Sequence, residues 1–182
     1  MKLEICPGLC IREIIENDKY SIVKYADNKK ISDNLRDAFP YPYALQDAEN
    51  WLALLNDNLP KRAFAVANNE EFIGAIGIEP CRDVNRFTGE LGYWLGEPYW
   101  GKGIATLAVQ KFINYVFEFY DLIKIFAYVF SSNPSSVRVL IKTGFKLEGC
   151  MRKQIVKNGQ TLDQLVYGIL KEDASGLGFK NS

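Results

Sequence analysis

One stretch of the sequence constrains the fold more than any other: a strand pattern, a glycine-rich turn and a long helix follow one another without a break. The strand pattern covers 88–95, and the helical pattern covers 103–120, where apolar residues recur at intervals of three and four. A further strand pattern follows at 124–130. A helix that joins two strands of one sheet makes them parallel, with a right-handed crossover. The sequence therefore predicts a mixed α/β fold in which 88–95 and 124–130 form a parallel pair.

The rest of the chain alternates between strands and helices, with no internal repeat and no low-complexity linker. Apolar runs predict strands, amphipathic spacing predicts helices, and Gly, Pro and Asn-Gly predict turns. This order indicates one domain over 1–171 and a tail over 172–182. The other predicted elements are a strand at 9–15, helices at 17–26 and 45–55, a hairpin of 63–67 with 71–79, a helix at 134–141, and a hairpin that turns at Asn158–Gly159 and returns over 161–170.

Histidine is absent from the 182 residues, and this limits the chemistry that the chain can perform. The absence excludes His-based triads, His zinc sites and imidazole general bases. Catalysis therefore has to use carboxylates, hydroxyls, thiols, amines or the backbone. The four cysteines include no Cys-x-x-Cys pair, so we expect no bound metal.

Charge and hydropathy limit the partners. The 22 Lys and Arg residues balance 22 Asp and Glu residues, so bulk charge favours no nucleic-acid partner. No apolar run approaches the roughly 18 residues of a membrane span, and the first residues lack the apolar run of a signal peptide. Together with four cysteines in no disulfide framework, these features indicate a cytoplasmic protein with no membrane partner.

The turn that precedes 103–120 has the chemistry of an anion site. Glycines let backbone N–H groups approach a ligand, and the start of a helix adds unpaired donors and the positive end of its dipole. Gly96, Gly101 and Lys102 also match the start of a P-loop, but Gly103 stands where a P-loop needs Ser or Thr to hold magnesium. An ordinary glycine-rich turn at the beginning of a helix is the remaining alternative.

Two motifs extend this interpretation. They are Glu-Leu-Gly-Tyr-Trp-Leu-Gly-Glu-Pro-Tyr-Trp-Gly-Lys-Gly-Ile-Ala-Thr at 90–106 and Asn-Pro-Ser-Ser-Val-Arg-Val-Leu-Ile-Lys-Thr-Gly-Phe at 133–145. With these motifs in this order, the chain resembles the GNAT superfamily of acyl-CoA-dependent N-acetyltransferases over about 9–170, and most of all its RimJ/RimL branch. Gly103 and Ala105 match the last two fixed positions of the family's pyrophosphate loop, Arg/Gln-x-x-Gly-x-Gly/Ala. Trp100 stands where the superfamily usually has Arg or Gln, although this branch often has Trp there.

The resemblance implies a GNAT fold: a mixed, mostly antiparallel sheet of about seven strands, flanked by helices, with a parallel pair that splays apart. It also implies acetyl-CoA as the cosubstrate, with its pyrophosphate on the backbone N–H groups of the loop. Lys102 would serve equally as a solvated surface lysine, and Asn133 equally as a helix cap. The residues that the resemblance assigns to CoA are Leu95, Gly101, Lys102, Gly103, Ile104, Ala105, Thr106 and Asn133.

The resemblance further implies that a primary amine attacks the thioester directly, without an acyl-enzyme. Glu90 takes the position of the general base, and its alternative role is that of a solvent-facing strand residue. Leu140 stands where many members have a Tyr acid, so Ser136 is the candidate acid for the leaving thiolate. Its alternative is an ordinary hydroxyl in the first turn of a helix. The backbone amide of Leu95 is the candidate oxyanion donor.

The acceptor side is the least specific part of the resemblance. Phe39, Tyr41, Tyr43 and Trp51 are expected to line the acceptor cleft, or else to act as packing anchors. The expected acceptor is a small-molecule or peptide amine, which includes a protein N-terminus or a polyamine, and the expected state is a monomer or a homodimer. The alternative function is a GNAT-fold module that binds CoA without catalysis and works by interaction.

Overall fold

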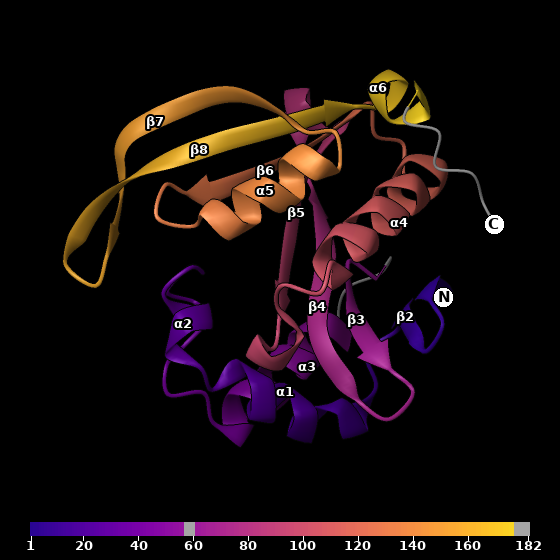
Figure 1. Ribbon diagram of the computed structural model, residues 1–182, viewed down its shortest axis with the longest axis vertical. Coiled ribbons are helices and arrows are strands. Elements are labelled where there is room, and N and C mark those ends of the chain that lie inside the picture. Colours follow the sequence, from indigo (N-terminus) through magenta and orange to yellow (C-terminus); the bar gives the residue numbers. More distant parts are fainter. Residues whose placement is uncertain (57–60, 177–182) are drawn as a thin grey trace. The chain divides into compact units, whose positions relative to one another are not determined.

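The computed structural model describes residues 1–56 and 61–176, whose helices and strands are drawn in Figure 1. Eight strands in these residues form a sheet in the order β1-β2-β3-β4-β5-β6-β8-β7. Among the pairs with a defined register, β5 and β6 are parallel and the others are antiparallel. The predicted mixed α/β fold with one parallel pair is therefore confirmed. The strands are β1 (Lys2–Cys6), β2 (Leu9–Arg12), β3 (Ala63–Asn68), β4 (Phe72–Pro80), β5 (Thr88–Leu95), β6 (Lys124–Phe130), β7 (Lys146–Lys157) and β8 (Gln160–Leu170).

The helices agree with the predicted ones to within a few residues, and two short helices are additional. Helix α2 was not predicted, and α6 begins the segment predicted as a tail, whose residues 177–182 lie outside the described part. No helix within 1–56 and 61–176 is long and apolar enough to cross a membrane. The helices are α1 (Lys19–Ala26), α2 (Lys29–Ser32), α3 (Leu45–Asn56), α4 (Ile104–Phe119), α5 (Pro134–Lys142) and α6 (Lys171–Gly176), with short 3-10 turns η1 (Glu16–Asp18), η2 (Asp83–Asn85) and η3 (Glu97–Tyr99).

The chain divides into two units. The first unit contains Met1–Gly77 and Tyr93–Ala108, and the second contains Ile78–Gly92 and Val109–Ser182. Because the division between the units falls between Gly92 and Tyr93 of β5, the motif at 90–106 is shared between them. The motif at 133–145 belongs wholly to the second unit.

The apolar core of the first unit lies on helices α1 and α3, which run side by side in Figure 1, and on strands β3 and β4. Ile22 and Ala26 are four residues apart on α1, and Ala48 and Leu52 are four apart on α3. This spacing places one apolar stripe on each helix, as the amphipathic pattern of 45–55 predicted. The strands add the buried side chains of Ala65, Ala67, Phe72 and Ala75.

Strand β6 lies between β5 and β8 in the second unit. It pairs in parallel with β5, from Thr88↔Lys124 to Glu90↔Phe126, and antiparallel with β8 along its whole length. Alternate β6 side chains and the apolar face of α4 are buried. The splaying of β5 from β6 beyond this register stays a prediction. The buried side chains are Ile125, Ala127 and Val129 of β6 with Phe112, Ile113 and Val116 of α4.

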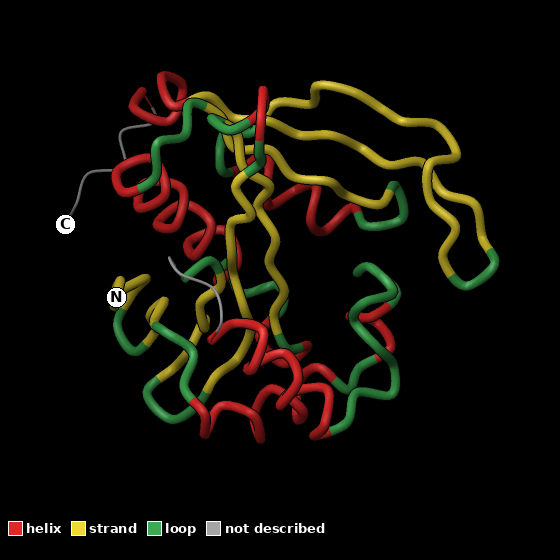
Figure 2. The backbone as a smooth tube through the Cα atoms, turned by 180° about the vertical axis from the view of Figure 1, so that it is seen from behind, coloured by secondary structure: helices red, strands yellow, loops and turns green. Residues whose placement is uncertain are grey.

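Strands β7 and β8 form a long hairpin, and Figure 2 shows them running together to their turn. At the turn, Asn158 has a φ of 51° and Gly159 a φ of 74°. Two consecutive left-handed residues are typical of a type I′ turn, so the Asn-Gly prediction is confirmed. The register shifts between Met151 and Ile155, where Lys153 also adopts a positive φ of 54°. This irregularity is typical of a β-bulge, which bends a strand.

Candidate active site

At the end of β5, the hydrogen-bonding groups of Leu95 and Gly96 point to opposite edges of the strand. The Gly96 N–H donates to the carbonyl oxygen of Ile73 on β4 at 2.8 Å. Because the peptide groups of successive strand residues point to opposite edges, the Leu95 N–H points away from β4. On that edge, the Leu95 carbonyl accepts a hydrogen bond of 2.7 Å from the indole nitrogen of Trp100. The Leu95 side chain is buried, so on this edge the residue presents only its backbone groups.

The loop that leads into α4 contains two residues in the left-handed region. Gly101 has a φ of 72° and Gly103 a φ of 78°, values that favour glycine. A Cβ atom at either position would meet no atom within 4 Å, so the space beside both is open. Helix α4 begins at Ile104, and Leu107 donates to the Gly103 carbonyl at 3.1 Å. The N–H groups of 104–106 therefore have no acceptor within the helix, and they lie at its positive end.

Polar side chains from 28–30 hold the start of η3. The Asn28 amide donates to Glu97 Oε2 at 2.7 Å, and Lys30 forms an ion pair with Glu97 Oε1. The hydrogen bond from Lys30, and then the one from Asn28, lower the pKa of the Glu97 carboxyl below its ordinary value. An exposed ion pair contributes little stability, so the main effect of these contacts is to fix the position of Glu97.

Tyr99 at the end of η3 is held by a second polar network. Its hydroxyl shares a hydrogen bond of 3.3 Å with the Tyr25 hydroxyl and accepts one of 3.3 Å from Asn68. Tyr25 in turn donates to Glu71 at 2.5 Å, and Lys24 donates to the same carboxylate at 2.9 Å. No local sequence pattern connects these residues, because Tyr25 and Tyr99 are 74 positions apart. Sequence reasoning therefore missed both tyrosines.

Lys102 extends over an aromatic ring of its own loop. Its side chain is exposed, and Nζ lies 5.8 Å from the centre of the Tyr99 ring. This distance falls within the range of a cation–π contact, which is weak at an exposed site. The contact keeps a positive charge near the start of α4 and agrees with either of the two roles predicted for Lys102.

Glu90 lies in the second unit, opposite Phe126 in the parallel register. Its side chain is half-buried, whereas the adjacent Gly89 and Leu91 are buried. A Cβ at Gly89 would lie 2.9 Å from the side chains of both Ile78 and Leu122, so β5 is closely packed on that face. By alternation, Glu90 lies on the opposite face of the strand from Gly89 and Leu91.

The start of α5 is capped by the side chain of Asn133. The amide oxygen of Asn133 accepts a hydrogen bond of 3.1 Å from the backbone N–H of Ser136, and Pro134 occupies the first turn. Asn133 is therefore a helix cap, as one of its two predicted roles requires. Ser136 is half-buried in this first turn. Leu140 is fully buried and contributes to the core.

The predicted acceptor residues belong to the first unit, and two of them, Phe39 and Tyr43, form an aromatic cluster with Trp94 and Phe72. The centre of the Phe39 ring lies 5.0 Å from that of Tyr43 and 5.6 Å from that of Trp94 on β5. Trp94 was missed because its strand pattern indicated only sheet formation. Tyr43 is buried, and burial raises the pKa of its phenol to about 12. Tyr41 is 50% exposed, which leaves its ring accessible to solvent.

Burial separates these aromatics into two kinds. Tyr43 belongs to the core of the first unit, so it has the contacts of a packing anchor. Phe39, Trp51 and Trp94 pack against that core, yet each is only half-buried. Of these three, Phe39 and Trp94 are in ring contact and together form a partly open aromatic surface, with Tyr41 exposed nearby in the chain.

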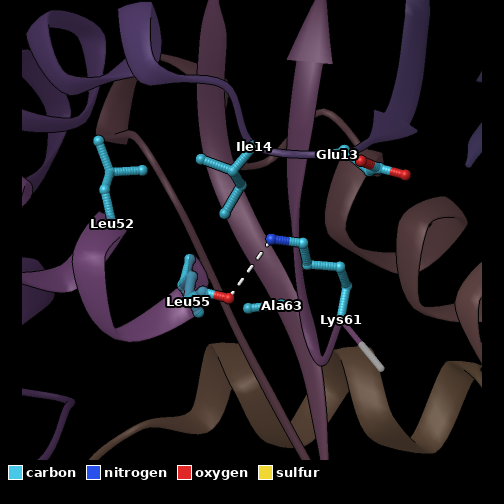
Figure 3. Close-up of a pocket in the computed structure, with 6 residues that line it drawn as sticks. All are labelled: Glu13, Ile14, Leu52, Leu55, Lys61 and Ala63. Atoms are coloured by element: carbon cyan, nitrogen blue, oxygen red, sulfur yellow. Dashed lines mark hydrogen bonds between the residues drawn. The ribbon is translucent and has the colours of Figure 1, made fainter. Parts of the chain in front are cut away.

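A surface pocket of the first unit is lined by other residues and is drawn in Figure 3. Its free volume is about 20 Å³, which is room for one or two water molecules. The Lys61 ammonium donates to the Leu55 carbonyl across it at 3.4 Å. The pocket is too small for a cosubstrate and includes none of the predicted site residues. It is lined by Glu13, Ile14, Leu52, Leu55, Lys61 and Ala63.

The predicted site residues are divided between the units. The first unit contains Leu95, the glycine loop with residues 101–106, and the aromatic cluster of Phe39, Tyr43 and Trp94. The second unit contains the carboxylate of Glu90 and the capped start of α5. Within 1–56 and 61–176, no group of three or more His, Cys, Asp or Glu side chains is placed to hold a metal ion.

Comparison with known proteins identifies the family. The Acetyltransferase (GNAT) domain model matches residues 8–146. The Bacillus subtilis uncharacterized N-acetyltransferase YoaA is 29% identical over 166 residues, which cover 90% of this chain and 93% of that protein. The ribosomal-protein-serine acetyltransferase of Escherichia coli is 30% identical over 139 residues, which cover 73% of this chain and 77% of that protein.

A solved structure supports the same family at the level of the fold. The RimL ribosomal L7/L12 alpha-N-protein acetyltransferase, solved in complex with coenzyme A, has a TM-score of 0.81 at 21% identity. The superposition covers 93% of this chain and 98% of that protein. With the matching family model and the two relatives, the chain belongs to the GNAT family of acetyltransferases, in its RimJ/RimL-like branch, and is an N-acetyltransferase.

Proposed function

We propose that the protein transfers the acetyl group of acetyl-CoA to a primary amine by direct attack within a ternary complex. The observation that carries this proposal is the glycine loop at the start of α4, where the space beside Gly101 and Gly103 is open and the N–H groups of 104–106 have no acceptor within the helix. The family match and the coenzyme A in the RimL structure support CoA as the occupant.

The loop suits the pyrophosphate of CoA without a cluster of basic side chains. Gly101 and Gly103 let the anion approach the main chain, and Ile104, Ala105 and Thr106 supply N–H donors at the positive end of α4. Lys102 adds one positive charge near this backbone site. This local grip explains how a chain with a formal net charge of zero can bind a strongly anionic cosubstrate.

The backbone of Leu95 is proposed to polarise the thioester carbonyl. Its N–H lies on the edge of β5 that faces away from β4, where it is not used by the β4 pairing at Gly96. A donor held by a strand needs no reorganisation when negative charge develops on the carbonyl oxygen. The Trp100 indole holds the neighbouring carbonyl of Leu95 and so keeps this peptide edge in place.

Glu90 is proposed to accept the proton that the ammonium must lose before its nitrogen can attack. The nitrogen then forms a bond to the carbonyl carbon, and the C–S bond of the thioester breaks. With no histidine in the chain, a half-buried carboxylate on β5, acting directly or through one water, is the available base.

Ser136 is proposed to donate a proton to the leaving thiolate, with water as the alternative donor. Its place in the first turn of α5 is fixed by the bond from its backbone N–H to Asn133. The Asn133 oxygen is used by this cap, so its amide nitrogen is the group that is proposed to contact CoA. Phe39, Tyr41 and Trp94 are proposed to receive the acceptor, because aromatic faces attract amines that carry positive charge.

Two measurements test this proposal in sequence. The melting temperature should rise with micromolar coenzyme A and stay unchanged with ATP, whereas a rise with ATP alone would favour a nucleotide site. Release of free thiol from acetyl-CoA should then depend on an added amine, in a panel of N-terminal peptides, polyamines and small amines. Binding of CoA without thiol release for any amine would favour the non-catalytic module.

A further inference from the structure

We propose that Tyr25 is a positioning residue for the loop 96–103, and that it sets how tightly this loop binds CoA without touching CoA. The inference rests on the proposed function, because it takes the loop to be the CoA site. Tyr25 lies on α1, outside both family motifs. Its side chain contacts the loop at both Gly96 and Tyr99.

The ring of Tyr25 packs against the backbone where the loop leaves β5. A Cβ at Gly96 would lie 2.6 Å from Cδ1 and 2.9 Å from Cγ of Tyr25. The ring thus fills the space that a side chain at 96 would need. At the same residue, the Gly96 N–H is bound to Ile73, so the start of the loop is held from two directions.

The hydroxyl of Tyr25 holds the other end of η3. It bonds to the Tyr99 hydroxyl at 3.3 Å, and the two rings meet edge to face with their centres 5.6 Å apart. One side chain therefore contacts the loop both before and at the end of η3. These two contacts restrict rotation of the turn that delivers Gly101 and Gly103 to the start of α4.

Such an external support is needed because the binding part of the loop cannot support itself. Gly101 and Gly103 have no side chains to pack, and glycine loses more backbone freedom on ordering than any other residue. If CoA had to order the loop on binding, the entropy lost in ordering it would weaken the affinity for CoA. Contacts at 96 and 99 order the preceding turn in advance, so they act on affinity from a distance.

The polar partners of Tyr25 fix the direction of its hydrogen bond. Burial, and then the bond to Glu71, raise the pKa of the Tyr25 phenol. Burial alone would raise the pKa of Glu71, but the bonds from Tyr25 and Lys24 lower it. Near neutral pH the phenol is therefore the donor and the carboxylate the acceptor, in a bond of 2.5 Å.

The variant Tyr25→Phe removes the hydroxyl and keeps the ring against Gly96, so the fold should survive. We expect the dissociation constant for CoA, measured by titration calorimetry, to rise about five- to tenfold because the hydrogen bonds to Tyr99 and Glu71 are lost. The KM for acetyl-CoA should rise by the same factor, with a smaller change in kcat. Tyr20→Phe is the matched control, since Tyr20 lies on the same helix and is 65% exposed.

A merely structural role would give a different result. Tyr25→Phe would then lower the melting temperature and the active fraction while the folded protein bound CoA as the wild type does, and that outcome overturns the proposal. Tyr99→Phe, alone and combined with Tyr25→Phe, should show effects on CoA affinity that do not add, because the two hydroxyls share one bond. Strictly additive effects would contradict the shared support. Failure of the wild type itself to bind CoA would overturn the proposed function together with this inference.

Discussion

The helices α4 and α5 begin in opposite ways. At α5, the Asn133 side chain accepts the N–H of Ser136, and Pro134 brings no N–H of its own. At α4, Gly103 has no side chain with which to cap the helix, and the space beside it is open. At α5 a side chain satisfies one of the free N–H donors, whereas the residue before α4 has no side chain that could do so.

This difference between the two helix starts distinguishes the motif at 90–106 from the motif at 133–145, although the two look alike in the sequence. Both motifs place a turn before a helix, and both were assigned to CoA by resemblance. The proposed ligand role belongs to the start of α4, because a helix N-terminus with glycines before it binds anions. The Asn133 oxygen caps α5, so only its amide nitrogen is proposed to contact a ligand.

The strongest way to break this comparison is to close the start of α4. Gly103→Val places a branched side chain at a φ of 78° and into the open space, so we expect the affinity for CoA to fall by about a hundredfold or more. Titration calorimetry measures the loss, and circular dichroism checks the fold. Gly149→Ala is the control, because a Cβ there also meets open space but without a positive φ. Tight binding by a folded Gly103→Val protein would sink the loop as the CoA site.

The second test separates binding from chemistry. Glu90→Gln keeps the shape of the side chain and removes the base, so kcat should fall by about a hundredfold while the dissociation constant for CoA stays within about twofold. The exposed Glu148→Gln on β7 serves as a control that should leave kcat near the wild-type value. If Glu90→Gln retains kcat at every pH, Glu90 is a surface residue of the strand.

The smallest expected effects sharpen the comparison at Asn133. Asn133→Ala removes the cap, which costs about 1 kcal/mol, and should lower the melting temperature by about 2–4 °C. Asn133→Ser keeps a capping oxygen but removes the amide nitrogen, so it should preserve most of the stability. If that nitrogen contacts CoA, both variants should bind CoA about three- to tenfold more weakly. Wild-type affinity in Asn133→Ser would restrict Asn133 to the cap.

Elements with a local physical cause were predictable from the sequence. The strand–turn–helix at 88–120 follows from apolar spacing and glycines, and the type I′ turn follows from Asn158–Gly159. The cap at Asn133 follows from its residue type before Pro134. The additional β1 was missed because five residues with Lys2 and Glu4 among them carry little apolar signal. Helix α2 was missed because four residues are too short to show a helical period.

Contacts between distant residues were not predictable. Tyr25 and Tyr99 meet although no pattern at either position requires it, and the Glu71 carboxylate, from a third segment, accepts the Tyr25 hydroxyl. Trp94 was understood as a strand residue, and its contact with Phe39 became visible only with the fold. Such side-chain networks depend on which elements pack together, and a single sequence does not encode that pairing locally.

The backbone character of the loop 101–106 has an evolutionary consequence. If main-chain N–H groups hold the cosubstrate, most substitutions at 104–106 keep the donors, and only the two left-handed glycines are tightly constrained. The proposed acceptor surface at Phe39, Tyr41 and Trp94 is made of side chains, so single mutations there would change its shape directly. Related proteins with this arrangement can change the amine that they acetylate while they keep acetyl-CoA as the acetyl donor.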